Sequence, residues 1–119
     1  MISGFRFIES YVHGGRVGVL IEVSFRSSFT VGVPEFKRLA SDLALQVAGA
    51  GPASVQDLVA QRFVKDDSVT VGEIIERVSA QLGESISVTR FVRWDTDQPQ
   101  SSPPPSTTPA AALRQRSTP

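Results

Sequence analysis

The chain of 119 residues carries 12 Lys and Arg against 12 Asp and Glu, and this zero net charge argues against a surface for nucleic acid. It has one His and no Cys, which excludes disulfides, thiolate nucleophiles and cysteine-based zinc sites. With 40% hydrophobic residues, no apolar run of about 18 residues and no secretion signal, it is predicted to be a soluble cytoplasmic protein that does not enter a membrane.

Two runs of aromatic and branched residues, at 5–12 and 17–25, flank Gly14 and Gly15. Two glycines between such runs indicate a β-hairpin, because a tight turn needs positive φ angles. A two-residue loop would place His13 opposite Arg16. This register predicts a core face made of Ile8, Val12, Val17, Val19, Ile21, Val23 and Phe25. The opposite face is then mixed, and its large apolar members are Phe7, Tyr11 and Leu20.

A helix is predicted from Pro34, which suits a first helical position, to the glycines and proline at 49–52. Its apolar residues recur at steps of three and four: Phe36, Leu39, Ala40, Leu43, Ala44, Val47 and Ala48. A short second helix is expected around 54–62, where Ser54 and Asp57 have the spacing of a weak capping pair.

A third helix is predicted to begin after Thr70, which has capping-box spacing to Glu73, and to end at Gly83. Val69 and Ile74 are placed for a hydrophobic staple. The adjacent Asp66 and Asp67 diverge too much to share a metal, so we expect their negative charge to favour the start of this helix.

The last predicted strand alternates Ile86, Val88, Val92 and Trp94 on one side, with Trp94 at the edge of the core. Two strands, three helices and a returning strand indicate an α+β domain at 1–94, in which helices cover one face of a small antiparallel sheet. Residues 95–119 are rich in Pro, Ser and Thr and predict a disordered tail, or alternatively a docking motif for a proline-binding domain.

Catalytic groups are scarce. His13 is the only imidazole and lies beside the expected turn, where a packed or solvated role is favoured over a catalytic one. The stretch Gly14-Gly15-Arg16 lacks the Gly-Lys-Ser/Thr ending of a phosphate-binding loop. Arg90, Arg93 and Trp94 do not form a platform for single-stranded nucleic acid. We therefore predict no enzymatic activity, no cofactor and no metal.

The segment GRVGVLIEVSFRSSFTVGVPEF at 15–36 resembles a signature of bacterial and organellar elongation factor Ts, which runs Gly-Arg-(Val/Ile)-Gly-Val-Leu-Val-Glu-Val and then Asn-Cys-Glu-Thr-Asp-Phe-Val. The segment FVKDDSVTVGEIIERVSAQLGESISVTRFVRW at 63–94 is similar to the C-terminal signature of the same family. The resemblance covers residues 5–94 and implies that family's dimerisation domain, which combines a three-stranded antiparallel sheet with helices.

The resemblance also implies a function, that of a guanine-nucleotide exchange factor for the GTPase elongation factor Tu. In the family, an Asp-Phe pair after the second strand enters the GTPase, where the Phe acts as a wedge. Phe29 matches that Phe, Ser28 the Asp and Ser27 the preceding Thr. Family members also pair through this domain, so Phe7, Tyr11 and Leu20 are expected to form a homodimer patch. Ordinary scattered surface residues are the alternative.

This chain departs from the family at the motif itself. Phe25-Arg26-Ser27-Ser28-Phe29-Thr30 replaces Cys-Glu-Thr-Asp-Phe-Val, so a carboxylate is lost and Arg26 reverses a charge. An N-terminal helical module and a long helical insertion between Val55 and Arg62 are also missing from the pattern. Two functions therefore remain: an exchange factor, or a degenerate paralogue that self-associates without exchange activity. For Phe29 the alternative to a wedge is a ring packed on the adjacent helix.

Overall fold

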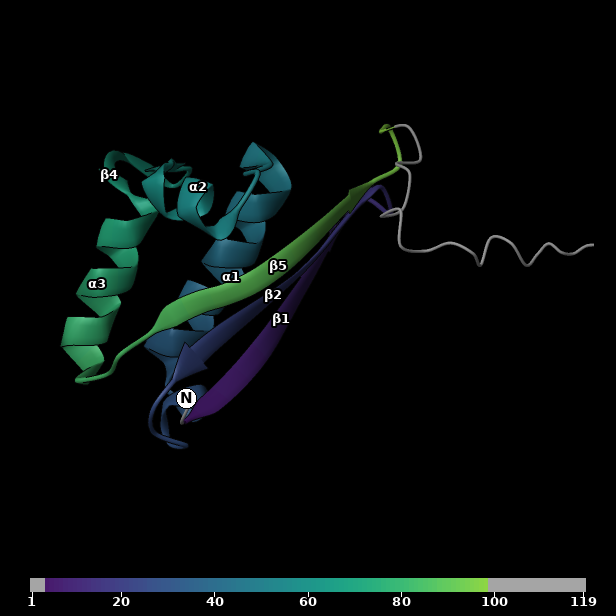
Figure 1. The fold of residues 1–119 in the computed structure, drawn as a ribbon. Coiled ribbons are helices and arrows are strands. Elements are labelled where there is room, and N and C mark those ends of the chain that lie inside the picture. The colour runs from purple at the N-terminus through teal and green to yellow at the C-terminus, as the bar shows by residue number, and fades with distance from the viewer. Residues whose placement is uncertain (1–3, 99–119) are drawn as a thin grey trace, which may run out of the picture.

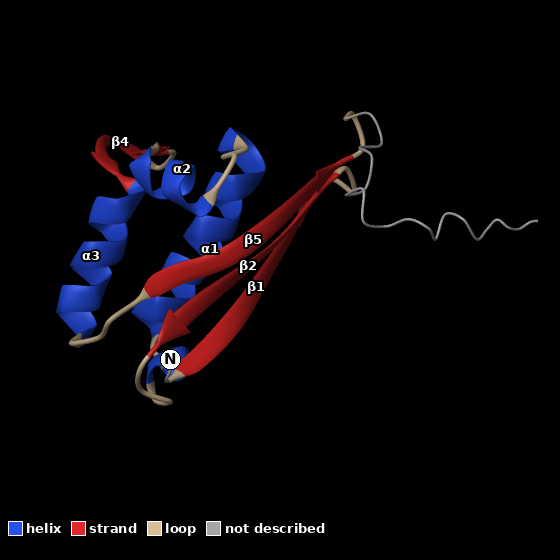
Figure 2. Ribbon diagram, in the orientation of Figure 1, coloured by secondary structure: helices blue, strands red, loops and turns tan. Residues whose placement is uncertain are grey.

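The computed structural model describes residues 4–98, in which helices cover one face of a three-stranded antiparallel sheet (Figure 1). The sheet has the order β1-β2-β5, and its strands are β1 (Phe5–His13), β2 (Val17–Phe25) and β5 (Ser87–Asp95). The helices follow β2 in the chain and are α1 (Pro34–Ala50), α2 (Val55–Ala60) and α3 (Val71–Leu82). Figure 2 shows the two layers, sheet and helices. The predicted α+β architecture is confirmed.

The hairpin turn is one residue longer than predicted, and this shifts the register of β1. Arg16 belongs to the turn, since its backbone N–H donates to the His13 carbonyl at 2.9 Å. His13 therefore pairs with Val17, and Phe5 pairs with Phe25. A slip of one residue turns every β1 side chain to the other face of the sheet. The predicted register and the faces drawn from it are therefore wrong for β1.

The corrected register changes which β1 residues face the helices. Phe7 pairs with Val23 and Tyr11 pairs with Val19, so both aromatic side chains pack against the core and are half-buried. Ile8 and Val12, which were expected in the core, are exposed on the opposite face. The predicted grouping of Phe7, Tyr11 and Leu20 on one face is thus wrong, because only Leu20 lies on the uncovered face.

A bulge in β5 changes the side on which its last residues lie. Val23 pairs with Val88 and Glu22 pairs with Arg90, so Thr89 is an extra residue in the ladder. Val88 remains buried, but the alternation then shifts by one residue. Trp94 falls opposite Gly18 and is 77% exposed, which contradicts its expected place at the edge of the core.

The first and third helices begin and end as predicted, whereas α2 ends at Ala60, two residues before the expected end. Pro34 opens α1, and Gly51 closes it with a left-handed backbone at φ +56°. The Ser54 side chain accepts a hydrogen bond from the Asp57 N–H at the start of α2. Thr70 and Glu73 form both bonds of the capping box of α3, and Gly83 ends that helix at φ +63°.

A second, two-stranded sheet was not predicted. It pairs β3 (Arg62–Phe63) with β4 (Asp66–Thr70), and it lies beside the buried side chain of Gln46. The Gln46 amide donates to the Arg62 carbonyl at 2.9 Å and accepts from the Val64 N–H at 2.8 Å, so its burial leaves no polar group unpaired.

Asp66 lies in β4 rather than in the first turn of α3. Its carboxylate accepts hydrogen bonds from the Ser68 hydroxyl at 2.6 Å and from the Ser68 N–H at 3.1 Å. These bonds lower the pKa of Asp66. The expected role of this carboxylate at the helix N-terminus is therefore replaced by a role in the turn before it.

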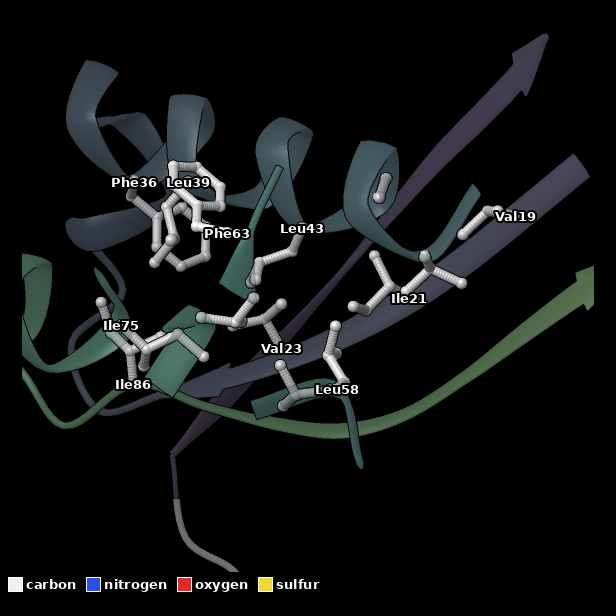
Figure 3. Close-up of a cluster of buried hydrophobic side chains, with 14 of the residues drawn as sticks. Val19, Ile21, Val23, Phe36, Leu39, Leu43, Leu58, Phe63, Ile75 and Ile86 are labelled. Atoms are coloured by element: carbon white, nitrogen blue, oxygen red, sulfur yellow. The ribbon is translucent and has the colours of Figure 1, made fainter. Parts of the chain in front are cut away.

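The core lies between the inner face of β2 and the three helices (Figure 3). Phe36 is fully buried and packs edge-to-face on Phe25, with ring centroids 5.0 Å apart. The ring of Phe7 also packs on that of Phe36, with centroids 5.7 Å apart. Since Phe25 ends β2 and Phe36 lies in the first turn of α1, this aromatic cluster fixes both ends of the loop that joins them.

The predicted tail at 95–119 lies mostly outside the described residues. Its first residues continue the hydrogen bonding of the sheet: the Thr96 N–H donates to the Arg16 carbonyl at 2.9 Å. The Arg16 guanidinium and the Asp97 carboxylate form an ion pair at 2.7 Å. The described part of the domain thus extends past Trp94, whereas the proline-rich residues 99–119 lie outside it.

Candidate functional site

The loop between β2 and α1, residues 26–33, carries the three predicted binding residues. It makes two tight turns, since the Thr30 N–H donates to the Ser27 carbonyl at 3.0 Å and the Gly32 N–H donates to the Phe29 carbonyl at 3.2 Å. A short 3-10 helix, η1 (Thr30–Gly32), then leads into α1. These local bonds give the loop a defined backbone.

Phe29 extends from this loop into solvent, and its side chain is 84% exposed. This exposure excludes the alternative in which the ring packs on the adjacent helix. Ser28 beside it is also exposed, whereas Ser27 is half-buried and its hydroxyl accepts a hydrogen bond from the Phe29 N–H at 3.3 Å. The structure therefore brings the three predicted residues together, with Ser28 and Phe29 facing outward and Ser27 supporting the backbone.

Glu84 holds this loop from the other half of the chain. It directly follows Gly83, whose left-handed backbone turns the chain out of α3. One carboxylate oxygen accepts from the Arg26 N–H at 2.9 Å, and the other accepts from the Ser27 N–H at 3.0 Å and from the Thr30 hydroxyl. Sequence reasoning placed Glu84 in a family signature but gave it no role, because a contact between residues 58 positions apart has no local pattern.

The environment of Glu84 strongly favours its ionised form. Partial burial acts to raise its pKa, but the hydrogen bonds from the Thr30 hydroxyl and from three backbone amides outweigh this effect. Together they lower the pKa of Glu84 from 4.5 to about 2. The loop is therefore bound to a full negative charge at any pH near neutrality.

The uncovered face of the sheet is a second candidate surface. Its exposed apolar side chains, which we call the outer sheet face, are those of Ile8, Val12, Leu20, Val92 and Trp94. A depression of about 360 Å³ lies among Ile8, Leu20 and Val92, with Glu22 and Arg90 also at its lining. Of the predicted dimer patch, only Leu20 belongs to this face.

Glu22 lies in the middle of the outer sheet face and is almost fully buried. Its carboxylate accepts from the Thr89 hydroxyl at 2.6 Å and from Arg90 at 3.2 and 3.3 Å, and Arg6 lies 3.8 Å away. The bond from Thr89, followed by that from Arg90, lowers the pKa of Glu22. The extra residue of the β5 bulge thus supplies the hydroxyl that holds this carboxylate.

The other polar residues considered from the sequence make internal contacts. The Tyr11 hydroxyl and His13 Nδ1 lie 2.9 Å apart at the end of β1. Arg93 donates to the Ala48 carbonyl at 3.0 and 3.2 Å and pairs with Asp95 at 3.3 Å. Among residues 4–98, no group of three His, Cys, Asp or Glu side chains is placed to hold a metal ion. No helix in the same residues is long and apolar enough to cross a membrane.

Comparison with known proteins gives a consistent set of relatives, although no family model matches the chain. Elongation factor Ts of Myxococcus xanthus is 32% identical over 133 aligned positions, which cover 74% of this chain and 61% of the relative. Elongation factor Ts of Nostoc sp. is 42% identical over 88 positions, which cover 73% of this chain and 28% of the relative. Elongation factor Ts of Coprothermobacter proteolyticus is 31% identical over 133 positions, which cover 73% of this chain and 68% of the relative.

The chain is shorter than these relatives. It spans 61% and 28% of the first two, and in the Myxococcus alignment 133 positions correspond to 74% of 119 residues, or about 88 residues. About 45 positions of that alignment therefore have no counterpart here. In the Nostoc alignment the 88 positions correspond to 73% of 119 residues, or about 87 residues, so that relative aligns almost without a gap. The identity to several relatives and the coverage together show that the chain belongs to the elongation factor Ts family.

Proposed function

We propose that the chain binds a GTPase of the elongation factor Tu type and promotes the release of its GDP. The observation that carries this proposal is the exposed ring of Phe29 on a loop whose backbone is fixed by hydrogen bonds. An aromatic side chain held in one position loses little conformational freedom on binding, and such anchors contribute most of the affinity at many interfaces. Family membership supports the identity of the partner.

The proposed activity requires no covalent chemistry. A protein that binds the nucleotide-free GTPase more tightly than the GDP-bound form lowers the affinity for GDP by the same factor. Phe29 would act as the wedge that favours the nucleotide-free form, and Ser28 and Ser27 would contact the partner or support the loop beside it. Since the partner acts in translation elongation, we place this function in the cytoplasm.

The loop also differs from the family motif in charge. Ser28 has no carboxylate, and the exposed Arg26 is positive where the motif has a Glu. A charge-assisted hydrogen bond is worth about 1.5 to 3 kcal/mol, so the loss of one carboxylate weakens binding without abolishing an apolar anchor. We therefore propose slower exchange than that of a protein with the full motif.

Stopped-flow release of a fluorescent GDP analogue from the GTPase tests the proposal. Addition of the full chain should accelerate release above the spontaneous rate, and Phe29→Ala should remove most of the acceleration. Val64→Ala is the matched control, because Val64 is also an exposed apolar residue in a turn but lies on the β3–β4 connection. Release at the spontaneous rate with the wild-type chain would refute the exchange function.

Self-association through the outer sheet face is the second candidate function. The specific observation in its favour is an apolar surface that the helices leave uncovered, with Trp94 77% exposed. Two such faces can pack on each other about a two-fold axis. We propose that this face replaces the predicted patch of Phe7, Tyr11 and Leu20 as the contact of a homodimer.

Sedimentation equilibrium of the full chain tests self-association. The wild-type chain should give the mass of a dimer, and Leu20→Asp should give that of a monomer, because it places a charge at the centre of the face. Gln81→Asp introduces the same charge on exposed α3 and should leave the dimer intact. A monomeric wild-type chain would reject this candidate and leave the exchange function unaffected.

A further inference from the structure

The loop that carries Phe29 has backbone donors that no strand or helix satisfies. The β1–β2 ladder ends at Phe25, and α1 begins at Pro34. The N–H groups of Arg26 and Ser27 therefore lie beyond the sheet, and both donate to the carboxylate of Glu84. The Ser27 N–H is half-buried, and such a group without a partner is costly, so this carboxylate determines how the first part of the loop is held.

The same carboxylate also reaches the far side of Phe29. The buried Thr30 hydroxyl donates to the oxygen that accepts from the Ser27 N–H. Glu84 thus binds the chain on both sides of residues 28 and 29, whose own side chains are exposed. Because both side chains are exposed, the orientation of the ring depends on the backbone that Glu84 holds.

We propose that Glu84 is a positioning residue for partner binding: its carboxylate fixes residues 26–30 so that Phe29 is presented in one orientation. This inference rests on the proposed function of Phe29, and in it Glu84 acts through the loop that its carboxylate holds. A fixed loop avoids the loss of conformational freedom that a mobile loop would incur on binding. Glu84 then affects affinity through the placement of Phe29.

Glu84→Gln is the most informative variant. It keeps the size of the side chain, but replaces one acceptor oxygen by an NH2 group that faces backbone donors. The hydrogen exchange of the Arg26 and Ser27 amides, measured by NMR on the free chain, should become at least about tenfold faster for one or both of them. Unchanged slow exchange of the α1 amides would show that the fold is intact.

The binding measurement separates positioning from a general structural role. Glu84→Gln should lower the affinity for the nucleotide-free GTPase about tenfold in isothermal titration calorimetry, and Glu84→Asp, which keeps the charge, should recover part of that loss. In the Phe29→Ala background the same Glu84→Gln change should have no further effect. Glu76→Gln, an equal charge change at an exposed site of α3, should change neither amide exchange nor affinity.

Two results would overturn the assignment. One is unchanged exchange of the Arg26 and Ser27 amides in Glu84→Gln, and the other is an equal loss of affinity in the wild-type and Phe29→Ala backgrounds. If the wild-type chain does not bind the GTPase at all, the proposed function fails. In that case the exchange of the Arg26 and Ser27 amides alone tests the role of Glu84. Faster exchange in Glu84→Gln still supports Glu84 as the residue that positions the loop.

Discussion

The 26–33 loop and the outer sheet face both expose apolar side chains, and each is organised around a glutamate with a lowered pKa. They differ in what the carboxylate holds. Glu84 accepts from backbone amides and fixes the path of the chain, whereas Glu22 accepts from the side chains of Thr89 and Arg90. In the two proposed functions, the loop presents a single ring for insertion into a partner, and the outer sheet face packs against a second copy of the same face.

Phe29→Ala should produce the largest change in this comparison. Removal of a central aromatic anchor costs about 2 kcal/mol or more, so affinity for the nucleotide-free GTPase should fall at least about 30-fold in a calorimetric titration. The thermal midpoint should not change, because the ring is 84% exposed. Equal affinities for Phe29→Ala and wild type would remove the distinction between a loop built for insertion and an ordinary surface loop.

Acid should weaken the loop through Glu84. Because the pKa is about 2 in the folded chain and 4.5 as the ordinary value, its contribution is complete above about pH 5 and is lost as pH falls toward 2. The shift corresponds to about 3 kcal/mol, which solvent screening reduces to about 2 kcal/mol. The lowered pKa values of Glu22 and Asp66 act in the same direction.

Urea unfolding at pH 7 and pH 3 measures this contribution. The free energy of unfolding of Glu84→Gln should lie about 2 kcal/mol below that of wild type at pH 7, and less than half of this difference should remain at pH 3. Glu76→Gln, which removes one charge at an exposed site of α3, is the matched control. A difference that is the same at both pH values would mean that the Glu84 charge does not stabilise the loop.

Ser28→Asp should increase the affinity of the loop for the GTPase. The change restores the carboxylate of the family motif at an exposed position beside Phe29, and one charge-assisted hydrogen bond corresponds to about a tenfold gain. The rate of GDP release at a fixed concentration of the chain should rise accordingly. Ser41→Asp, at an exposed serine of α1, provides the matched control. A slower release would show that the partner surface no longer accepts a negative charge here.

Trp94→Ala should have the smallest effect on the folded monomer. The side chain is 77% exposed, so the free energy of unfolding should change by no more than about 0.5 kcal/mol in urea. The same change should weaken a dimer formed through the outer sheet face. A large loss of monomer stability would place Trp94 in the core after all and reduce the contrast between the two regions.

The helices could be predicted because their signals are local. Thr70 and Glu73 cap α3 through bonds that span three residues, and Gly83 and Gly51 end their helices with backbones that favour glycine. The loop position of Phe29 followed from the resemblance. Its exposure did not, because exposure depends on what the rest of the chain packs against it.

The errors in the predicted strand faces come from two single residues, each of which shifts the alternation of side chains along a strand. Arg16 joined the turn, which exchanged Phe7 with Ile8 between the two faces, and Thr89 added a residue to β5, which moved Trp94 outward. Neither residue carries a sequence signal for its role, since both turn lengths and a bulge suit the same pattern. Contacts between distant segments, such as that of Glu84 with Ser27, could not be predicted because they leave no local pattern in the sequence.

The bond between Ser27 and Glu84 joins residues 57 positions apart, and this separation has a consequence for synthesis on the ribosome. The chain emerges from its N-terminus, so Phe29 leaves the exit tunnel well before the residue that fixes its loop. During this interval the tip lacks its carboxylate support. A nascent chain that stops before Glu84 therefore displays the aromatic ring without the residue that orients it. The proposed binding then requires that the last third of the domain has been translated.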